Sequence, residues 1–184
     1  DHNRGAFQPF FETFLKQTQA ANTAEEFLGY FSEVPTLFTH AVHANDEELS
    51  SIKKGSHSII HCPISNRLLG NGALDLNRLE EHSISWVCGT DGLSSNYALD
   101  LFEEMKSALF MHHHHNLLSL AHMLWQSVTS NAAEALRLNS GKIAPNYDAD
   151  ILILHIDYPI NEQLPVHLIV QPHVIESVYI QGEK

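Results

Sequence analysis

Residues 58–88 read SIIHCPISNRLLGNGALDLNRLEEHSISWVC, and this stretch decides the fold class. Its two ends, residues 58–62 and 83–88, are short runs that are apolar on both faces rather than alternating. Such runs are typical of parallel strands that helices cover. Between them, residues 75–82 have helical periodicity, whereas the polar, glycine-containing residues 63–72 predict a loop. The stretch therefore predicts a strand–helix–strand unit of an α/β fold.

The same order of elements extends toward the N-terminus. Residues 36–40 form another short apolar run, and residues 46–54 are predicted to be helical. Asn45 and Glu48 have the spacing of a helix N-cap and its capping-box partner. Residues 7–31 are helix-rich, with phenylalanines at helical spacing.

The composition changes toward the C-terminus. Two helices and then two strands are predicted there, over residues 97–111, 117–136, 149–154 and 174–180. A proline-containing stretch separates the two strands, which are typical of a small β domain. We therefore expect two parts, residues 1–140 and residues 141–184.

Composition and charge exclude several classes of protein. The 184 residues suffice for one ordinary domain, and the formal net charge of -12 would repel phosphate backbones and anionic lipids. We expect neither nucleic acid nor a membrane surface as a partner. No apolar run is long enough to span a bilayer, and no leader segment opens the chain, so a cytoplasmic location is expected.

The cysteines and the histidine run favour structural roles. Cys62 and Cys88 are the only cysteines, and each lies in an apolar run, so both are expected to be buried thiols rather than a disulfide. Four consecutive histidines occupy residues 112–115. Consecutive side chains point in divergent directions, so we expect a solvated helix end or loop rather than a metal site.

Polar side chains follow each predicted strand at its carboxyl end, where functional groups of a parallel sheet gather. They are His40, the corner formed by His61, Cys62 and Pro63, and Asp91. Asp91 is either a hard oxygen ligand for a divalent ion or the cap of the next helix. His40 is a metal ligand, a general acid or base, or a buried structural histidine.

The predicted loop after the second strand offers two further candidates. Asn66 can tie this loop to the backbone, or contact a substrate. Arg67 is a planar donor for a carboxylate or phosphate, and the alternative is a surface or ion-paired arginine.

These motifs together resemble a known family. THAVH at residues 39–43, HCPISN at residues 61–66 and GTDGLSSN at residues 89–96 resemble the last three barrel strands of the aminohydrolase branch of the amidohydrolase superfamily. TSNAAEAL at residues 129–136 and GKI at residues 141–143 are similar to the closing helix of that family and its return into a β-sandwich. The chain is identified as the C-terminal part of a (β/α)8 TIM barrel with strands of a small β-sandwich.

The resemblance implies a cofactor and two residue roles. Members of this branch hold one divalent metal, usually zinc and sometimes iron. Asp91 matches the aspartate that binds the metal, accepts a proton from the attacking water and passes it to the leaving amine. His40 matches a histidine that contacts the attacking hydroxide and the tetrahedral centre, while the position of His61 is mainly structural. The other metal ligands of the family have no counterpart here, and we expect them upstream of Asp1.

Within the branch, the residues around Asn66 and Arg67 are most similar to the 6-aminodeoxyfutalosine deaminases of menaquinone biosynthesis. This similarity implies hydrolytic deamination of an aminopurine nucleoside, with Arg67 pairing with a carboxylate of the substrate. The alternatives are deamination of S-adenosylhomocysteine, adenosine or guanine, or a chlorohydrolase reaction. A non-catalytic assembly or metal-binding module is the alternative of another class. The habit of the family also implies a homodimer.

Overall fold

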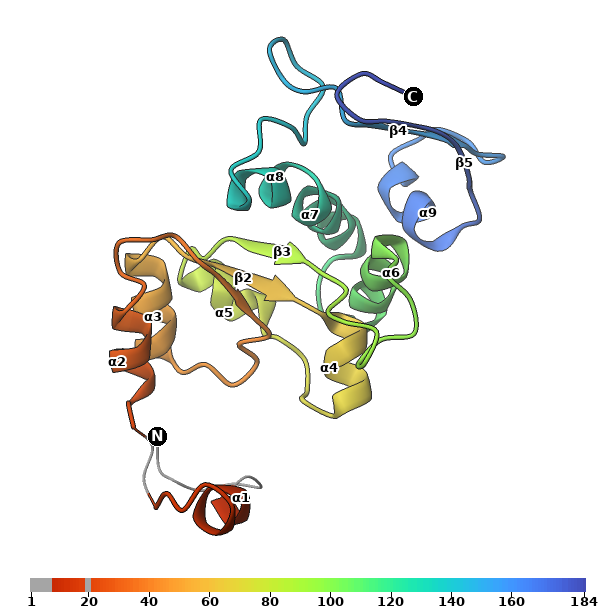
Figure 1. Ribbon diagram of the computed structural model, residues 1–184. Helices are drawn as coiled ribbons and strands as arrows, with labels where there is room; N and C mark the ends of the chain where they lie inside the picture. The colour runs from red at the N-terminus through yellow and green to blue at the C-terminus, as the bar shows by residue number, and fades with distance from the viewer. Residues whose placement is uncertain (1–7, 19–20) are drawn as a thin grey trace.

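The computed structural model describes residues 8–18 and 21–184 and has an α/β architecture (Figure 1). Residue 7, at the start of the predicted helix-rich segment, lies outside the described residues. The elements follow one another in the order α1 Gln8–Thr13, α2 Ala24–Gly29, β1 Leu37–Thr39, α3 Asp46–Lys54, β2 Ser58–His61, α4 Pro63–Leu69, α5 Leu76–Glu81, β3 Trp86–Cys88, α6 Leu101–Met111, α7 Leu117–Val128, α8 Ser130–Ala135, β4 Ile151–His155, α9 Leu164–Val170 and β5 Val174–Tyr179.

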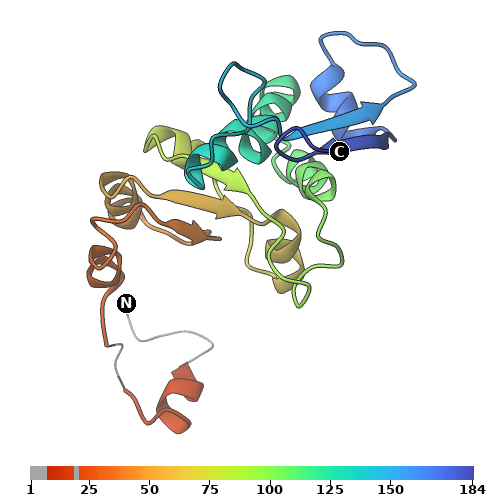
Figure 2. The ribbon, with the colours of Figure 1, turned by 45° about the horizontal axis from the view of Figure 1, so that its top comes forward.

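The predicted parallel sheet is present. Its order is β1-β2-β3, and both pairings are parallel, with Phe38 opposite Ile59 and Ile60 opposite Val87. Helices α6, α7 and α8 pack on β3, as Figure 2 shows from a second direction. Buried Leu, Ile, Met and Trp side chains of the sheet and its helices form one continuous core. This core holds the carboxyl ends of the three strands in fixed positions.

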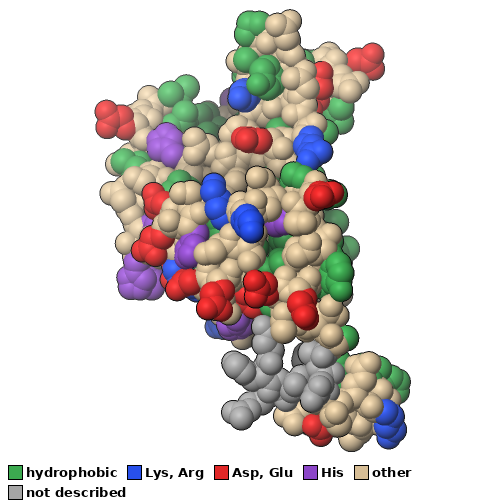
Figure 3. All heavy atoms as spheres, turned by 90° about the vertical axis from the view of Figure 1, so that its left-hand side faces the viewer, with side chains coloured by type: hydrophobic (Ala, Val, Ile, Leu, Met, Phe, Trp, Pro, Cys, Tyr) green, Lys and Arg blue, Asp and Glu red, His purple; other side chains and the backbone are tan. Residues whose placement is uncertain are grey.

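Helix α3 begins where the capping-box spacing predicts. The Asn45 side chain accepts from the backbone N–H of Glu48, and the Glu48 carboxylate accepts from the backbone N–H of Asn45. Leu49 and Ile52 on its inner face are buried. Figure 3 shows acidic side chains over α2 and α3, whose first turns are acidic. The carboxylates lie at the positive ends of these helices, where they are stabilising.

Replacing Asn45 by alanine is expected to lower the free energy of unfolding by about 1 kcal/mol, because the capping bond is lost. Urea denaturation of the variant measures the change. Asn77→Ala is the matched control, because Asn77 lies inside the short helix α5, where alanine is the better helix former. An equal loss in both variants would show that the capping box contributes nothing.

The segment after β2 corrects the sequence analysis. The expected loop over residues 63–72 is wrong, because residues 63–69 form α4. Pro63 stands in the first turn, where a missing N–H costs nothing, and Gly70 ends the helix with a φ of 71°. Proline and glycine are common in loops, but they are also the residues that start and stop a helix.

Three smaller differences concern the C-terminal half. Helix α6 begins at Leu101, where Asp100 is the N-cap, rather than near residue 97. The long helix predicted over residues 117–136 is divided into α7 and α8 at Thr129, whose φ of -125° and ψ of -97° are not helical. The stretch between β4 and β5 contains α9.

The last strands pair as a separate two-stranded antiparallel sheet, β4-β5. Helix α9 attaches this sheet to the rest, because Val166 and Ile169 are buried in the common core. The Trp125 indole of α7 also donates to the Pro165 carbonyl at 2.9 Å. In contrast, α1 stands apart from the other elements in both ribbon views.

None of the helices within residues 8–18 and 21–184 has the length and apolar character needed to cross a bilayer.

Candidate functional site

The carboxyl ends of the strands bring His40 and Asp91 together. His40 follows β1 directly, and its backbone N–H continues the parallel ladder by donating to the Ile60 carbonyl at 2.9 Å. Asp91 follows β3 by three residues. The His40 Nε2 atom lies 3.5 Å from Asp91 Oδ2, and each side chain is 31% exposed. The two groups therefore lie close together, and both remain accessible to a small molecule.

The backbone is strained at both residues. His40 has a φ of 71°, Ala41 a φ of 49° and Asp91 a φ of 58°, all in the left-handed region. Such conformations cost about 1–3 kcal/mol each for residues other than glycine, and they persist where the surrounding structure enforces them. Other non-glycine residues share this conformation, among them Ser56 and Ser83 at the opposite edge of the sheet, so it is the pairing of His40 with Asp91 that marks the candidate site.

Neighbouring loops hold the strained segments in place. Arg78 of α5 donates to the Ala44 carbonyl at 2.9 Å and to Asp46 at 2.6 Å, so it fixes the loop that follows His40. Gly89 lets the segment that leads to Asp91 pass close to β2. A Cβ atom there would lie 2.6 Å from Cγ2 of Ile60.

Asp91 is held as a charged carboxylate. Its Oδ2 atom accepts from the Ser65 hydroxyl at 2.7 Å and from the Ser95 hydroxyl at 2.9 Å, and Oδ1 accepts from the Gly92 N–H at 2.8 Å. These hydrogen bonds, that of Ser65 first, lower the pKa of Asp91. Asp91 does not cap a helix, because Asp100 caps the next one. The capping alternative is thereby excluded.

The side chains at this edge could supply part of the ligand set of a metal ion. A carboxylate has about four acceptor positions, and the three hydrogen bonds leave one of them on Asp91 for a cation. His40 Nδ1 is buried and has no hydrogen-bond partner within the described part of the chain. No group of three or more His, Cys, Asp or Glu side chains that could hold an ion occurs among these residues.

The remaining candidates lie elsewhere. Asn66 is fully buried in α4, and its side-chain amide has no partner among the described residues. Arg67 is exposed and lines a separate depression of about 280 Å³, together with Tyr97 and Lys106. At 100° per residue, Arg67 lies about 200° around α4 from Ser65, the residue that contacts Asp91. Among the described residues, no hydrogen bond or ion pair joins Asn66 or Arg67 to His40 or Asp91, and their role in a site stays a prediction.

The histidine run corrects a further expectation. His113 and His114 are exposed, as expected, but His112 is buried, and its Nε2 atom lies 2.9 Å from Nε2 of the fully buried His61. His112 directly follows the last residue of α6. Because this helix packs on the sheet, the ring of His112 lies inside the protein. The expectation of a solvated run is therefore wrong for His112. Cys62 and Cys88 are buried free thiols, as predicted.

Ser65 and Ser95, whose hydroxyls donate to Asp91, were not singled out in the sequence analysis. Ser95 lies within the motif around Asp91, and Ser65 lies within HCPISN. Both serines therefore belong to motifs that carry the family resemblance. Their hydrogen bonds to Asp91 depend on the bend of the chain at Gly92 and on the helix that replaces the expected loop.

Comparisons with known proteins bear on the family and the fold of this chain. The model of the amidohydrolase family matches residues 8–184. An aminodeoxyfutalosine deaminase of a Nitratiruptor species is 43% identical over 186 residues, which are 100% of this chain and 45% of the relative. The chain thus spans about half the length of the curated relatives it matches.

Solved structures show the same likeness. The Helicobacter pylori aminofutalosine deaminase in complex with methylthio-coformycin has a TM-score of 0.92 and 33% identity, over 100% of this chain and 46% of that structure. A Xanthomonas campestris adenosine deaminase with bound zinc has a TM-score of 0.69 and 24% identity, over 80% of this chain and 36% of that structure. The second likeness shows the fold alone.

Proposed function

Because this chain belongs to the amidohydrolase family, we propose that it forms the C-terminal half of a metal-dependent deaminase that acts on an aminopurine nucleoside. The observation that carries the proposal is the pair formed by His40 and Asp91, 3.5 Å apart at the carboxyl edge of the sheet. A histidine and an ionised carboxylate at this distance serve both proton transfer and the recognition of a tetrahedral centre.

The roles of the two residues follow from their chemistry. Water adds to the ring carbon that bears the amino group, and Asp91 accepts the proton that this water loses. Asp91 then passes this proton to the amino nitrogen, which leaves as ammonia when its bond to carbon breaks. The second proton of the water passes from the new hydroxyl to the adjacent ring nitrogen, which took up the electron pair of the opened C=N bond, and the carbonyl forms. The His40 imidazole donates to the oxygen that gains negative charge in the tetrahedral intermediate. Ser65 and Ser95 keep the Asp91 carboxylate in one orientation during both proton transfers.

A divalent ion, which we propose to be zinc, would bind to Asp91 and to ligands from the other half of the protein. When bound, it would lower the pKa of the attacking water and so supply a nucleophile near neutral pH. The unused acceptor position on Asp91 is consistent with an incomplete donor set in this stretch. His40 stays outside the ligand set in this proposal.

Membership of the amidohydrolase family also supports a proposal about the architecture of the whole protein. We propose that residues 1–140 supply the last three strands of a (β/α)8 barrel and that residues 141–184 supply strands of a β-sandwich. Strands β1 and β3 each have one unpaired edge within the described residues, which the other barrel strands would cover. The similarity to aminodeoxyfutalosine deaminases supports 6-aminodeoxyfutalosine as the substrate and a step of menaquinone biosynthesis as the role.

A substrate panel tests this proposal. The purified full-length protein should release ammonia from 6-aminodeoxyfutalosine faster than from adenosine, S-adenosylhomocysteine or guanine, and should contain about one divalent ion per chain. Faster turnover of another nucleoside would reassign the substrate within the branch. Absence of both ammonia release and bound metal would contradict the deaminase and favour a non-catalytic module.

The second measurement concerns Arg67, which we propose binds the carboxylate of such a substrate. Arg67→Leu should raise KM for the carboxylated nucleoside by about tenfold to a hundredfold, because a charge-assisted hydrogen bond is lost, and should leave KM for adenosine unchanged. Arg137→Leu, just beyond the end of α8, is the matched control. An equal effect on both substrates would remove Arg67 from the binding site, in line with its separation from Ser65.

A further inference from the structure

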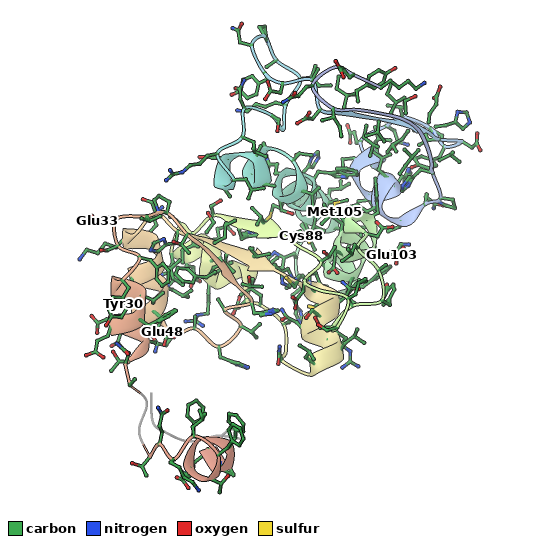
Figure 4. The ribbon with its side chains drawn as sticks, in the orientation of Figure 1. Tyr30, Glu33, Glu48, Cys88, Glu103 and Met105 are labelled. Carbon is green, nitrogen blue, oxygen red and sulfur yellow. The ribbon has the colours of Figure 1, made fainter. Side chains whose placement is uncertain are left out.

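Glu104 is a fully buried carboxylate near the start of α6. Among the described residues no Lys, Arg or His forms an ion pair with it. Burial of a carboxylate without a cationic partner costs free energy, and burial raises the pKa of Glu104. Figure 4 labels its neighbours in sequence, Glu103 and Met105, together with Cys88 at the end of β3. An apolar side chain would suit this environment better unless the carboxylate makes specific contacts.

Glu104 makes two such contacts, one with each of two separate segments. Its Oε2 atom accepts from the backbone N–H of Ile64 at 3.1 Å, in the first turn of α4. Its Oε1 atom accepts a short hydrogen bond from the side-chain amide of Asn96, which is also buried. Asn96 in turn donates to the Thr90 carbonyl at 2.7 Å and accepts from the Tyr97 N–H at 2.8 Å.

Both segments lead directly to Asp91. Ser65 follows Ile64 in α4 and donates its hydroxyl to Asp91 at 2.7 Å. Thr90, which Asn96 holds by its carbonyl, precedes Asp91 in the chain. Glu104 therefore accepts hydrogen bonds from both segments. One segment carries Ser65, which donates to the Asp91 carboxylate, and the other carries Thr90, which precedes Asp91 in the chain. The apolar neighbours Met105, Ala108 and Leu109 anchor α6 in the core independently of this link.

We propose that Glu104 is a positioning residue, which fixes α4 against the segment of residues 90–97 and so holds the Asp91 carboxylate in its working orientation. Its effect on turnover rests on the proposed deaminase function, whereas its effect on the two segments does not. Residues that orient a ligand or a catalytic carboxylate in this way typically contribute about 10- to 100-fold to metal affinity or activity.

The test is Glu104→Gln in the full-length protein. Glutamine has the same shape, but it turns one acceptor oxygen into a donor, which must then face either the Ile64 N–H or the Asn96 amide. Glu103→Gln is the matched control, because it makes the same chemical change one residue away. Glu103 is partly exposed and pairs with Lys106 at 3.0 Å, a contact that contributes little to stability. It also accepts from the Tyr97 hydroxyl at 3.3 Å, and the side-chain oxygen of a glutamine can still accept this hydrogen bond.

Two readouts are needed. In Glu104→Gln, amide hydrogen exchange should become faster by on the order of tenfold in residues 64–66 and 90–98, and should stay unchanged in α7 and the β strands. The kcat for deamination should fall by about 10- to 100-fold, with KM changed by less than about threefold. Glu103→Gln should match the wild type in both measurements.

The outcomes separate the two proposals. Wild-type deamination with unchanged exchange and kcat in Glu104→Gln would overturn the role of Glu104 and leave the deaminase intact. A wild-type protein that deaminates nothing would overturn the proposed function, while the exchange measurement would still decide whether Glu104 joins the segments. If Glu104→Gln does not fold, Asn96→Ala cuts the same link from the other side and is judged by the same criteria.

Discussion

Replacement of Asp91 by asparagine is expected to reduce the proposed deamination by the full-length protein at least about 10³-fold, because the proposed proton carrier is lost. Asparagine keeps the size of the side chain but has no negative charge and only one acceptor oxygen. The hydroxyls of Ser65 and Ser95 will still find an acceptor, so the fold around β3 should be preserved. The loss will therefore appear in kcat rather than in the midpoint of thermal unfolding.

The same variant should lose its metal. An ionised carboxylate supplies both charge and a hard oxygen donor, and an amide oxygen supplies neither the charge nor comparable affinity. Dialysis followed by elemental analysis should find about one ion per wild-type chain and far less in Asp91→Asn. Asp157→Asn serves as the control, because the Asp157 side chain is 93% exposed and pairs with His155, far from the candidate site in sequence. Full metal content in an inactive Asp91→Asn variant would limit Asp91 to proton transfer.

The sequence predicted the positions that periodicity and capping determine. The strands around residues 37, 58 and 86 are apolar on both faces, a pattern that depends only on burial in a parallel sheet. The start of α3 was predicted to the residue because Asn45 and Glu48 satisfy each other locally. The placement of His40 and Asp91 at one edge then followed from the parallel order of the strands.

The sequence could not predict features that depend on distant partners. Residues 63–69 carry a proline start and a glycine stop that fit a loop and a helix equally well, and their packing in the core selects the helix. The neighbours of His112 are histidines that favour solvent, but the end of α6 lies against His61, which is distant in the sequence. The role of Ser65 likewise depends on a contact with Asp91 across 26 positions of sequence.

Buried Glu104 shows the same limit. Its neighbours Met105, Ala108 and Leu109 give α6 an apolar face, and a charged residue next to them is typical of the edge of a solvated face. Only the tertiary contacts with Ile64 and Asn96 reveal that this carboxylate is internal. A buried polar group needs a partner from somewhere in the fold, and periodicity along one helix does not identify that partner.

The buried pair of His61 and His112 should make the protein sensitive to acid. The two Nε2 atoms lie 2.9 Å apart, so one ring must donate and the other must accept, and burial disfavours charge on either ring. Burial, followed by the charges of His112 and His40, lowers the pKa of His61 to about 3. Burial, followed by the charge of His115, lowers the pKa of His112 to about 4.

The direction of the effect follows from the two states. In the unfolded chain both histidines titrate near pH 6.5, whereas in the folded protein they stay neutral until pH 4 or below. Their stabilising contribution is therefore complete above pH 6.5. Below that pH, each histidine lowers the free energy of unfolding by up to about 1.4 kcal/mol per pH unit until its folded pKa is reached. Glu104 has the opposite effect on stability. Because burial raises its pKa, the folded state binds a proton at a higher pH than the unfolded state does, so a falling pH raises the free energy of unfolding at this residue.

His112→Gln isolates this contribution. Glutamine can still hydrogen-bond to His61, but it does not titrate, so the decline in the free energy of unfolding between pH 6.5 and pH 4 should become about half as steep. Urea denaturation at several pH values measures the slope. His113→Gln is the matched control, because its exposed ring should leave the slope unchanged. A slope that is the same in both variants would show that the buried pair is not the acid-sensitive element, and that the carboxylates dominate the response.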